Sequence, residues 1–76
     1  MNAKRRKAIA SIMNDLTMIK DRIEDIEGEE TDYLESMPEN LCYSERAETA
    51  EAAVDALTRA VQAAEECNDA LEESAE

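Results

Sequence analysis

The chain has 76 residues, enough for one small domain, and its 20 acidic and 8 basic side chains give a formal net charge of −12. This charge favours solubility and argues against direct binding to nucleic acid or to an anionic membrane, because phosphate contacts depend mainly on Lys and Arg. With two Tyr and no Phe, Trp or His, the core must be aliphatic, and Ser-His and Cys-His nucleophile pairs are excluded.

The N-terminus carries one basic cluster, Lys4–Lys7. We do not expect it to start a signal peptide, because the segment that follows is amphipathic and contains Asn14 and Asp15. No segment approaches the ~20 apolar residues that a membrane span needs. Two Cys in such a chain fit a reduced setting, so we expect a cytoplasmic location.

A helix is predicted from about residue 2 to residue 36, continuing past Gly28. Large apolar side chains recur there at alternating intervals of three and four residues, which places them on one helical face and excludes a strand of period two. With Ile9 at heptad position a, these side chains fill the a and d rows. The a row holds Ile9, Leu16, Ile23 and Met37, and the d row holds Ile12, Ile19, Ile26 and Tyr33.

Pro38 interrupts the helical pattern, since proline lacks the backbone donor and disfavours helical geometry at the residue before it. We expect a loop over residues 37–43 and a second helix over about 44–74. Ser44 is its expected N-cap, with Glu45 and Glu48 in the first turn, where the helix dipole favours anions. The a and d rows of this helix are Ala47, Ala50, Val54, Leu57, Val61, Ala64, Asn68, Leu71 and Ala75.

The short connection predicts that the two helices run antiparallel. The predicted fold class is therefore all-α: an antiparallel two-helix coiled-coil hairpin that forms one domain over residues 1–76. Folding the chain about Asn40 pairs residues whose numbers add up to 80, so that Ile26 faces Val54. In this register Lys4–Lys7 lie opposite residues 73–76 and are neutralised there. Asn68 at a core position indicates either fraying near the chain end or a device that selects one register, and the second interpretation is favoured.

Small side chains flank the seam of the second helix on one side. Two interpretations are open: Ala is a strong helix former on any surface, or the stripe lets another helix approach closely. The second interpretation predicts a homodimer, an antiparallel four-helix bundle that tightens as salt screens the charge of −12. The predicted dimer interface is Ala53, Ala56, Ala60, Ala63 and Cys67.

Acidic residues concentrate near the predicted loop, where residues 24–51 hold eleven of them against Arg46 alone, a net charge of −10. Two interpretations are again open, a solvated surface or a binding site for a basic protein that weakens with salt. The predicted partner-binding residues are Glu24, Glu27, Glu29, Glu30, Asp32 and Glu35.

No catalytic, cofactor or metal site is predicted. The acidic run 24–32 lacks the order of ligands in an EF-hand. Cys42 and Cys67 are separated by about 35 Å of helical rise, too far to join, and two thiols without His are no zinc site. We therefore expect a protein that is not an enzyme.

The segment Met37-Pro38-Glu39-Asn40-Leu41, followed by Ser44-Glu45-Arg46-Ala47-Glu48, resembles small, acidic, uncharacterised helical proteins of phages and prophages of Gram-positive bacteria. Gly28 and Cys42 depart from that pattern. The resemblance implies a bacterial cytoplasmic setting and an accessory role with no catalysis.

Three functional hypotheses follow. The first is a stoichiometric protein-binding module, such as an acidic inhibitor of a host nucleic-acid-binding or defence protein. The alternative is a structural scaffold that oligomerises within a phage assembly. The least favoured is a binder of phosphate or nucleotide ligands through paired Lys4–Lys7 clusters.

Overall fold

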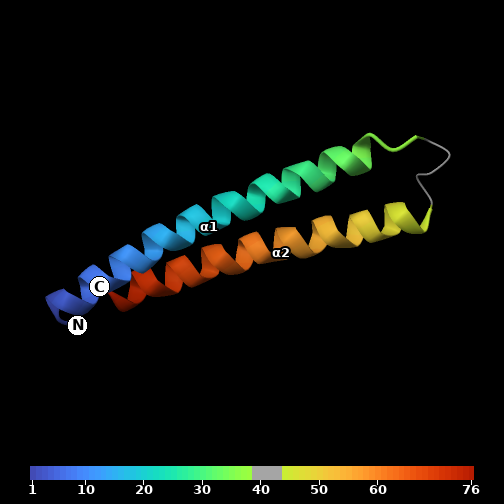
Figure 1. Cartoon of the computed structure of the whole chain (residues 1–76). Coiled ribbons are helices and arrows are strands. Elements are labelled where there is room, and N and C mark those ends of the chain that lie inside the picture. The colour runs from blue at the N-terminus through green and yellow to red at the C-terminus, as the bar shows by residue number, and fades with distance from the viewer. Residues whose placement is uncertain (39–43) are drawn as a thin grey trace.

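A computed structural model describes residues 1–38 and 44–76 of the chain. It contains two helices, α1 over Ala3–Glu35 and α2 over Glu45–Ser74. They run side by side in opposite directions, with both termini at one end (Figure 1). The prediction of an all-helical hairpin is confirmed. Residues 39–43, most of the expected loop and Cys42 among them, lie outside the described residues.

Polar side chains cap the start of each helix. The Asn2 side chain accepts a hydrogen bond from the backbone N–H of Arg5 at 2.8 Å, and Ser44 Oγ accepts one from Ala47 N–H at 3.3 Å. Glu45 and Glu48 occupy the first turn of α2, as expected for the positive end of a helix dipole. These bonds pair backbone donors that the first turn leaves without helical partners.

The predicted seam of α2 is confirmed. All nine of its a and d residues are buried or half-buried, from Ala47 to Ala75. Ala47 and Ala50 are the only fully buried residues in the described part of the chain, with 1% and 3% of their surface exposed.

The predicted seam of α1 is correct for the a row and wrong for the d row. Ile9, Leu16 and Ile23 are half-buried against α2, whereas the d-row residues leave 45–52% of their surface exposed. α1 is rotated so that its e row, rather than its d row, joins the a row at the interface. The e row consists of Met13, Lys20, Glu27 and Leu34, all half-buried.

The predicted register is also wrong. Within the described residues, three contacts between polar side chains join the helices: Glu27 with Thr58, Thr17 with Asn68, and Lys20 with Glu65. In each pair the residue numbers add up to 85 rather than 80, a displacement of five residues, or about 7.5 Å along the helix. The rotation of α1 is the physical reason, because the e row reaches α2 side chains that the d row cannot reach.

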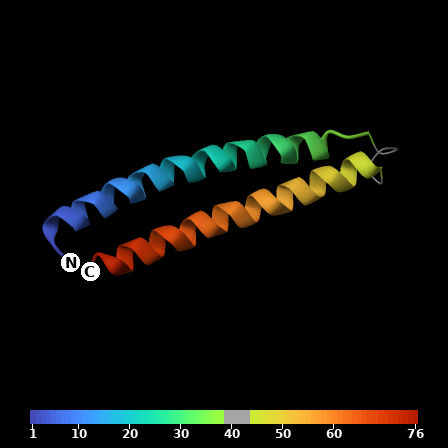
Figure 2. The same ribbon diagram turned by 60° about the horizontal axis from the view of Figure 1, so that its bottom comes forward.

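The expected neutralisation of Lys4–Lys7 is not found. The two chain ends lie near each other (Figure 2), yet within the described residues no ion pair joins residues 4–7 to residues 73–76. The ion pairs of this part of the chain are Lys20–Glu24, Lys20–Glu65 and Arg59–Asp55.

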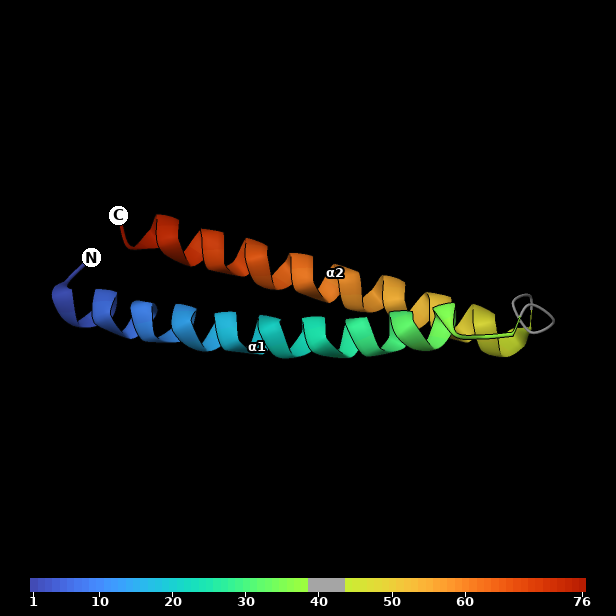
Figure 3. The same ribbon diagram turned by 90° about the horizontal axis from the view of Figure 1, so that it is seen from above.

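The hairpin is a rod of 59 × 15 × 12 Å, in which the two helices draw closer towards the loop end in the view from above (Figure 3). Its radius of gyration is 17.4 Å, whereas a compact chain of this length has about 11 Å. Two helices side by side, with no further helix packed on either face, leave each side chain open to water on at least one side. This explains why no Ile, Leu or Val is fully buried among the described residues.

Gly28 lies inside α1 without interrupting it, and a Cβ added there would meet no atom within 4 Å. We predict that Gly28→Ala raises the free energy of unfolding by about 1 kcal/mol, because Ala restricts the unfolded chain and favours the helix. Urea unfolding followed by circular dichroism measures this change. The reverse substitution at an exposed position of α2, Ala52→Gly, should lower stability by a similar amount; a destabilised Gly28→Ala variant would contradict the prediction.

Candidate functional site

One side of the hairpin carries an exposed apolar row from each helix, and the two rows together are here termed the Ile/Ala face. α1 contributes its d row, in which Ile12, Ile19 and Ile26 have 47%, 48% and 52% of their surface exposed and Tyr33 has 45%. α2 contributes the predicted dimer-interface stripe. Ala53 and Ala60 of that stripe are half-buried, and Ala56, Ala63 and Cys67 are exposed.

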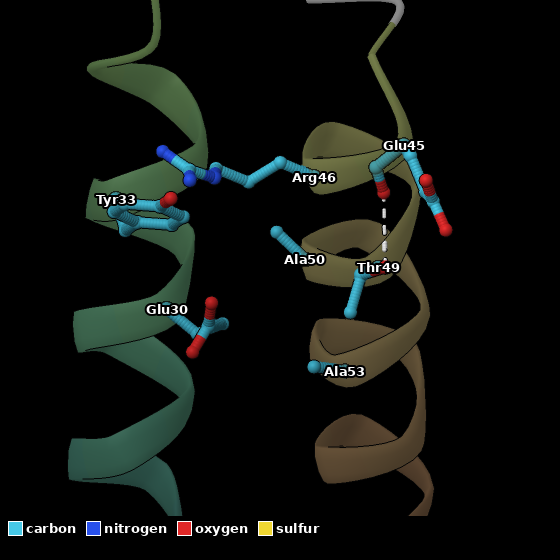
Figure 4. A pocket seen from close by; sticks show the side chains of 7 residues that line it. All are labelled: Glu30, Tyr33, Glu45, Arg46, Thr49, Ala50 and Ala53. Atoms are coloured by element: carbon cyan, nitrogen blue, oxygen red, sulfur yellow. Dashed lines mark hydrogen bonds between the residues drawn. The ribbon is translucent and has the colours of Figure 1, made fainter.

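The two rows lie on the same side of the molecule at the loop end. There Tyr33 and Glu30 of α1 share an open hollow of about 550 Å³ with residues of α2. Figure 4 shows Arg46 reaching across from α2 towards Tyr33, with Ala50 and Ala53 below it. Thr49 lies at the side of the hollow, and its hydroxyl donates to the Glu45 carbonyl oxygen at 2.9 Å. The hollow is therefore the end of the Ile/Ala face, with an alanine floor.

The opposite side of the hairpin is closed by polar contacts. Thr58 donates to a Glu27 carboxylate oxygen at 2.8 Å, and the Lys20 ammonium lies 3.6 Å from Glu65. The Asn68 amide donates to Thr17 at 3.2 Å. The hairpin thus has one side joined by hydrogen bonds and ion pairs and one side that is apolar and open.

Sequence reasoning found only the α2 half of the Ile/Ala face. It assigned the isoleucines of the d row to the contact with α2, so they were not recognised as surface residues. A signal was present: α1 carries apolar side chains in three adjacent rows, with Met13 and Leu34 in the e row. A stripe of a, d and e residues is typical of a helix with more than one neighbour, whereas an a/d stripe suits a single partner.

The predicted acidic residues do not form a single patch. Their heptad positions differ from one another, so they surround α1 on all sides. Glu24 pairs with Lys20 at 3.7 Å, Glu27 accepts from Thr58, and Glu30 is half-buried at the hollow. Glu29, Asp32 and Glu35 are exposed, and each lacks an ion pair in the described structure. The acidic end is thus a ring of charge around a helix.

Residues 1–38 and 44–76 bring no three His, Cys, Asp or Glu side chains together as a set of metal ligands. Neither helix there is long and apolar enough to cross a membrane. Cys67 is an exposed free thiol on the Ile/Ala face. The feature that the geometry defines is therefore the exposed apolar Ile/Ala face.

Comparison with known proteins gives no match to this chain among protein-family models, curated proteins or solved structures. The resemblance of residues 37–48 to phage proteins accordingly stays a prediction.

Asn68 has an unpaired buried atom, because its side-chain oxygen is inaccessible and accepts no hydrogen bond. An unsatisfied buried acceptor costs about 1–3 kcal/mol. We predict that Asn68→Leu raises the free energy of unfolding by about 1–2 kcal/mol. This is a net value: burial of an apolar side chain and removal of the unpaired oxygen stabilise the fold, and loss of the hydrogen bond to Thr17 destabilises it by less. Thermal and urea unfolding test this, with the exposed Asn14→Leu as a near-neutral control. A less stable Asn68→Leu variant would show that the Thr17 bond outweighs the unpaired oxygen.

Proposed function

We propose that this protein is a non-catalytic, stoichiometric protein-binding module that works as a homodimer, two hairpins stacking their Ile/Ala faces into a four-helix bundle. The observation that carries the proposal is the exposure of Ile12, Ile19 and Ile26 along one face of a chain whose only fully buried described residues are two alanines. The acidic end of each hairpin then offers a charged surface to a basic protein.

Burial energetics support association. A fully buried Ile or Leu contributes about 1.5–3 kcal/mol, and the isolated hairpin realises only part of that for every large apolar residue. Domains of this size are marginal even when compact. Covering the d row of α1 completes the burial of three isoleucines per chain, enough to turn a marginal fold into a stable one.

The exposed area of the chain supports the same conclusion. The hairpin exposes 5840 Å², whereas a compact monomer of 8.5 kDa exposes about 4,650 Å². The excess is about 1,200 Å² per chain. Stable protein–protein interfaces bury about 1,200–2,000 Å² in total from both partners. A single additional hairpin is therefore sufficient to cover the excess surface.

A second copy is the occupant that the side chains favour. The face has large residues along one helix and small residues along the other, so it can pack against itself at helix spacings within the usual 8–10 Å. Self-complementary faces usually close with two-fold symmetry. The charge of −12 per chain opposes this association, so the dimer tightens as salt rises.

The acidic end supports binding to a basic partner, in the manner of an acidic inhibitor of a nucleic-acid-binding protein. Its exposed carboxylates Glu29, Asp32 and Glu35 have no cation beside them in the described chain. A scaffold role is the second candidate, favoured by the length of the Ile/Ala face along the rod. The two differ in whether the acidic residues are needed for function.

We predict that Ile19→Glu weakens dimerisation at least about a hundredfold. Each dimer loses the burial of the exposed half of two isoleucines, about 1.5–3 kcal/mol, and must also desolvate two carboxylates at the interface; each 1.4 kcal/mol is a tenfold change in the dissociation constant. Sedimentation equilibrium at moderate salt should give about 17 kDa for the natural chain, twice its mass of 8.5 kDa, and a monomer for the variant.

The matched control is Ala52→Glu, which adds the same charge at an exposed position off the Ile/Ala face. It should leave the dimer intact and the helical circular dichroism unchanged. A natural chain that sediments at 8.5 kDa across micromolar concentrations, with its helices intact, refutes the homodimer.

We predict that the tagged protein, purified from its host at low salt, retains a basic protein that is released as salt rises. Reversing Glu24 and Glu35 to Lys should abolish its recovery, because both carboxylates lie at the acidic end and off the Ile/Ala face. The control reverses Glu66 and Glu73, which changes the net charge equally near the chain ends. Equal recovery with both variants would favour the scaffold role.

A further inference from the structure

We infer that the two hairpins of the proposed dimer stack head to tail, with a two-fold axis that crosses the Ile/Ala face at the level of Ile19 and Glu65. This inference rests on the proposed homodimer and adds its geometry. Two face-to-face arrangements are possible. Parallel hairpins set α1 of one copy against α2 of the other, whereas head-to-tail hairpins set each helix against its own antiparallel copy.

The first argument is that the row of α1 is symmetric about Ile19. At seven-residue intervals it reads Arg5, Ile12, Ile19, Ile26 and Tyr33. A two-fold axis at Ile19 places that residue against its own copy and Ile12 against the partner's Ile26. Arg5 meets the partner's Tyr33 at each end of the row, and a guanidinium and an aromatic ring attract each other.

The row of small residues on α2 is symmetric about position 65. It reads Ala56, Ala60, Ala63, Cys67, Ala70 and Ser74, at equal distances before and after that position. The two centres of symmetry lie at the same level of the rod, because the Lys20 ammonium is 3.6 Å from the Glu65 carboxylate. One axis therefore serves both helices. Under it α1 packs through isoleucines and α2 packs through small residues, each at a spacing that helices adopt.

The second argument is electrostatic. The loop half of the rod, residues 24–60, carries 12 acidic and 2 basic side chains, a net charge of −10. The terminal half, residues 1–23 and 61–76, carries 8 acidic and 6 basic side chains, a net charge of −2. Parallel hairpins place −10 against −10, whereas head-to-tail hairpins place −10 against −2 at both ends. Facing charges lie within about one Debye length at 0.1 M salt, so salt does not screen out the difference in repulsion between the two arrangements.

The basic cluster then gains the counter-charge that it lacks within its own hairpin. Lys4 and Arg5 are exposed and have no ion pair in the described chain. In the head-to-tail arrangement they reach the partner's loop end, where Glu29 and Asp32 flank Tyr33 on the exposed side of α1. Opposite charges meet at both ends of the bundle, and they orient the two copies before the apolar faces close.

Distances between spin labels separate the two arrangements. Ala3 is exposed and lies 16 positions before Ile19, about 24 Å along the helix. In a chain with Cys42→Ser, Cys67→Ser and Ala3→Cys, the two labels of a head-to-tail dimer should be about 48 Å apart by pulsed electron resonance. Parallel hairpins give about 20 Å, the width of the bundle. A label at Asp21→Cys, close to the axis level, is the control and stays short in both arrangements.

A second measurement uses cross-linking at the axis. With Cys42 and Cys67 replaced by Ser, Ile19→Cys should form an interchain disulfide under mild oxidation, because it meets its own copy. Ile12→Cys should not cross-link with itself, and it should do so with Ile26→Cys in an equimolar mixture. A distance of about 20 Å between the Ala3 labels would overturn the head-to-tail geometry. So would an Ile19→Cys variant that is dimeric but forms no interchain disulfide. A monomeric mass in sedimentation overturns the proposed dimer itself.

Discussion

The width of the apolar stripe on α1 is the constraint on which the rest of the structure depends. Three adjacent rows of this helix carry large apolar residues, and α2 alone covers the a and e rows. Because a helix covers little more than one stripe of its neighbour, the isoleucines of the d row stay about half exposed. The hairpin therefore has a well-defined topology with an incomplete core, and the Ile/Ala face follows from that mismatch.

The two sides of the hairpin divide polar and apolar contacts between them. The helices are joined on one side by a half-buried hydrogen bond from Thr58 to Glu27 and by a solvent-accessible ion pair between Lys20 and Glu65. Such contacts are individually weak when water reaches them, so their main effect is to select the rotation of α1 and the register. Within residues 1–38 and 44–76 the other side carries no such contacts, and burial of its apolar side chains is completed only when another apolar surface covers them.

Charge is distributed unevenly along the length of the rod, and apolar side chains are distributed unevenly around it. The loop half carries a net charge of −10 and the terminal half −2. Two loop halves therefore repel each other more strongly than a loop half repels a terminal half. The acidic carboxylates surround α1 instead of gathering on one face, which leaves some of them accessible on any bundle formed through the Ile/Ala face. The proposed dimer and the proposed binding of a basic protein would therefore use separate surfaces.

Much of the fold could be predicted from the sequence because its signals are local. Asn2 and Ser44 cap the helices, Pro38 follows the first one, and the alternation of three and four residues places the whole seam of α2. The acidic end and the small-residue stripe could be read in the same way. The site that combines them could not, because Ile12, Ile19 and Ile26 fit the contact with α2 as well as Met13 and Leu34 do.

What the sequence by itself determined is therefore the two helices, their antiparallel pairing and the inward rows of α2. Only the tertiary structure decided the rotation of α1 and the register, since the a/d and a/e seams have the same three-and-four spacing. The choice between them depends on contacts between residues far apart in the chain, such as Lys20 with Glu65 and Thr17 with Asn68. A local pattern contains no information about such pairs, and the exposed isoleucines become visible only once those contacts are in place.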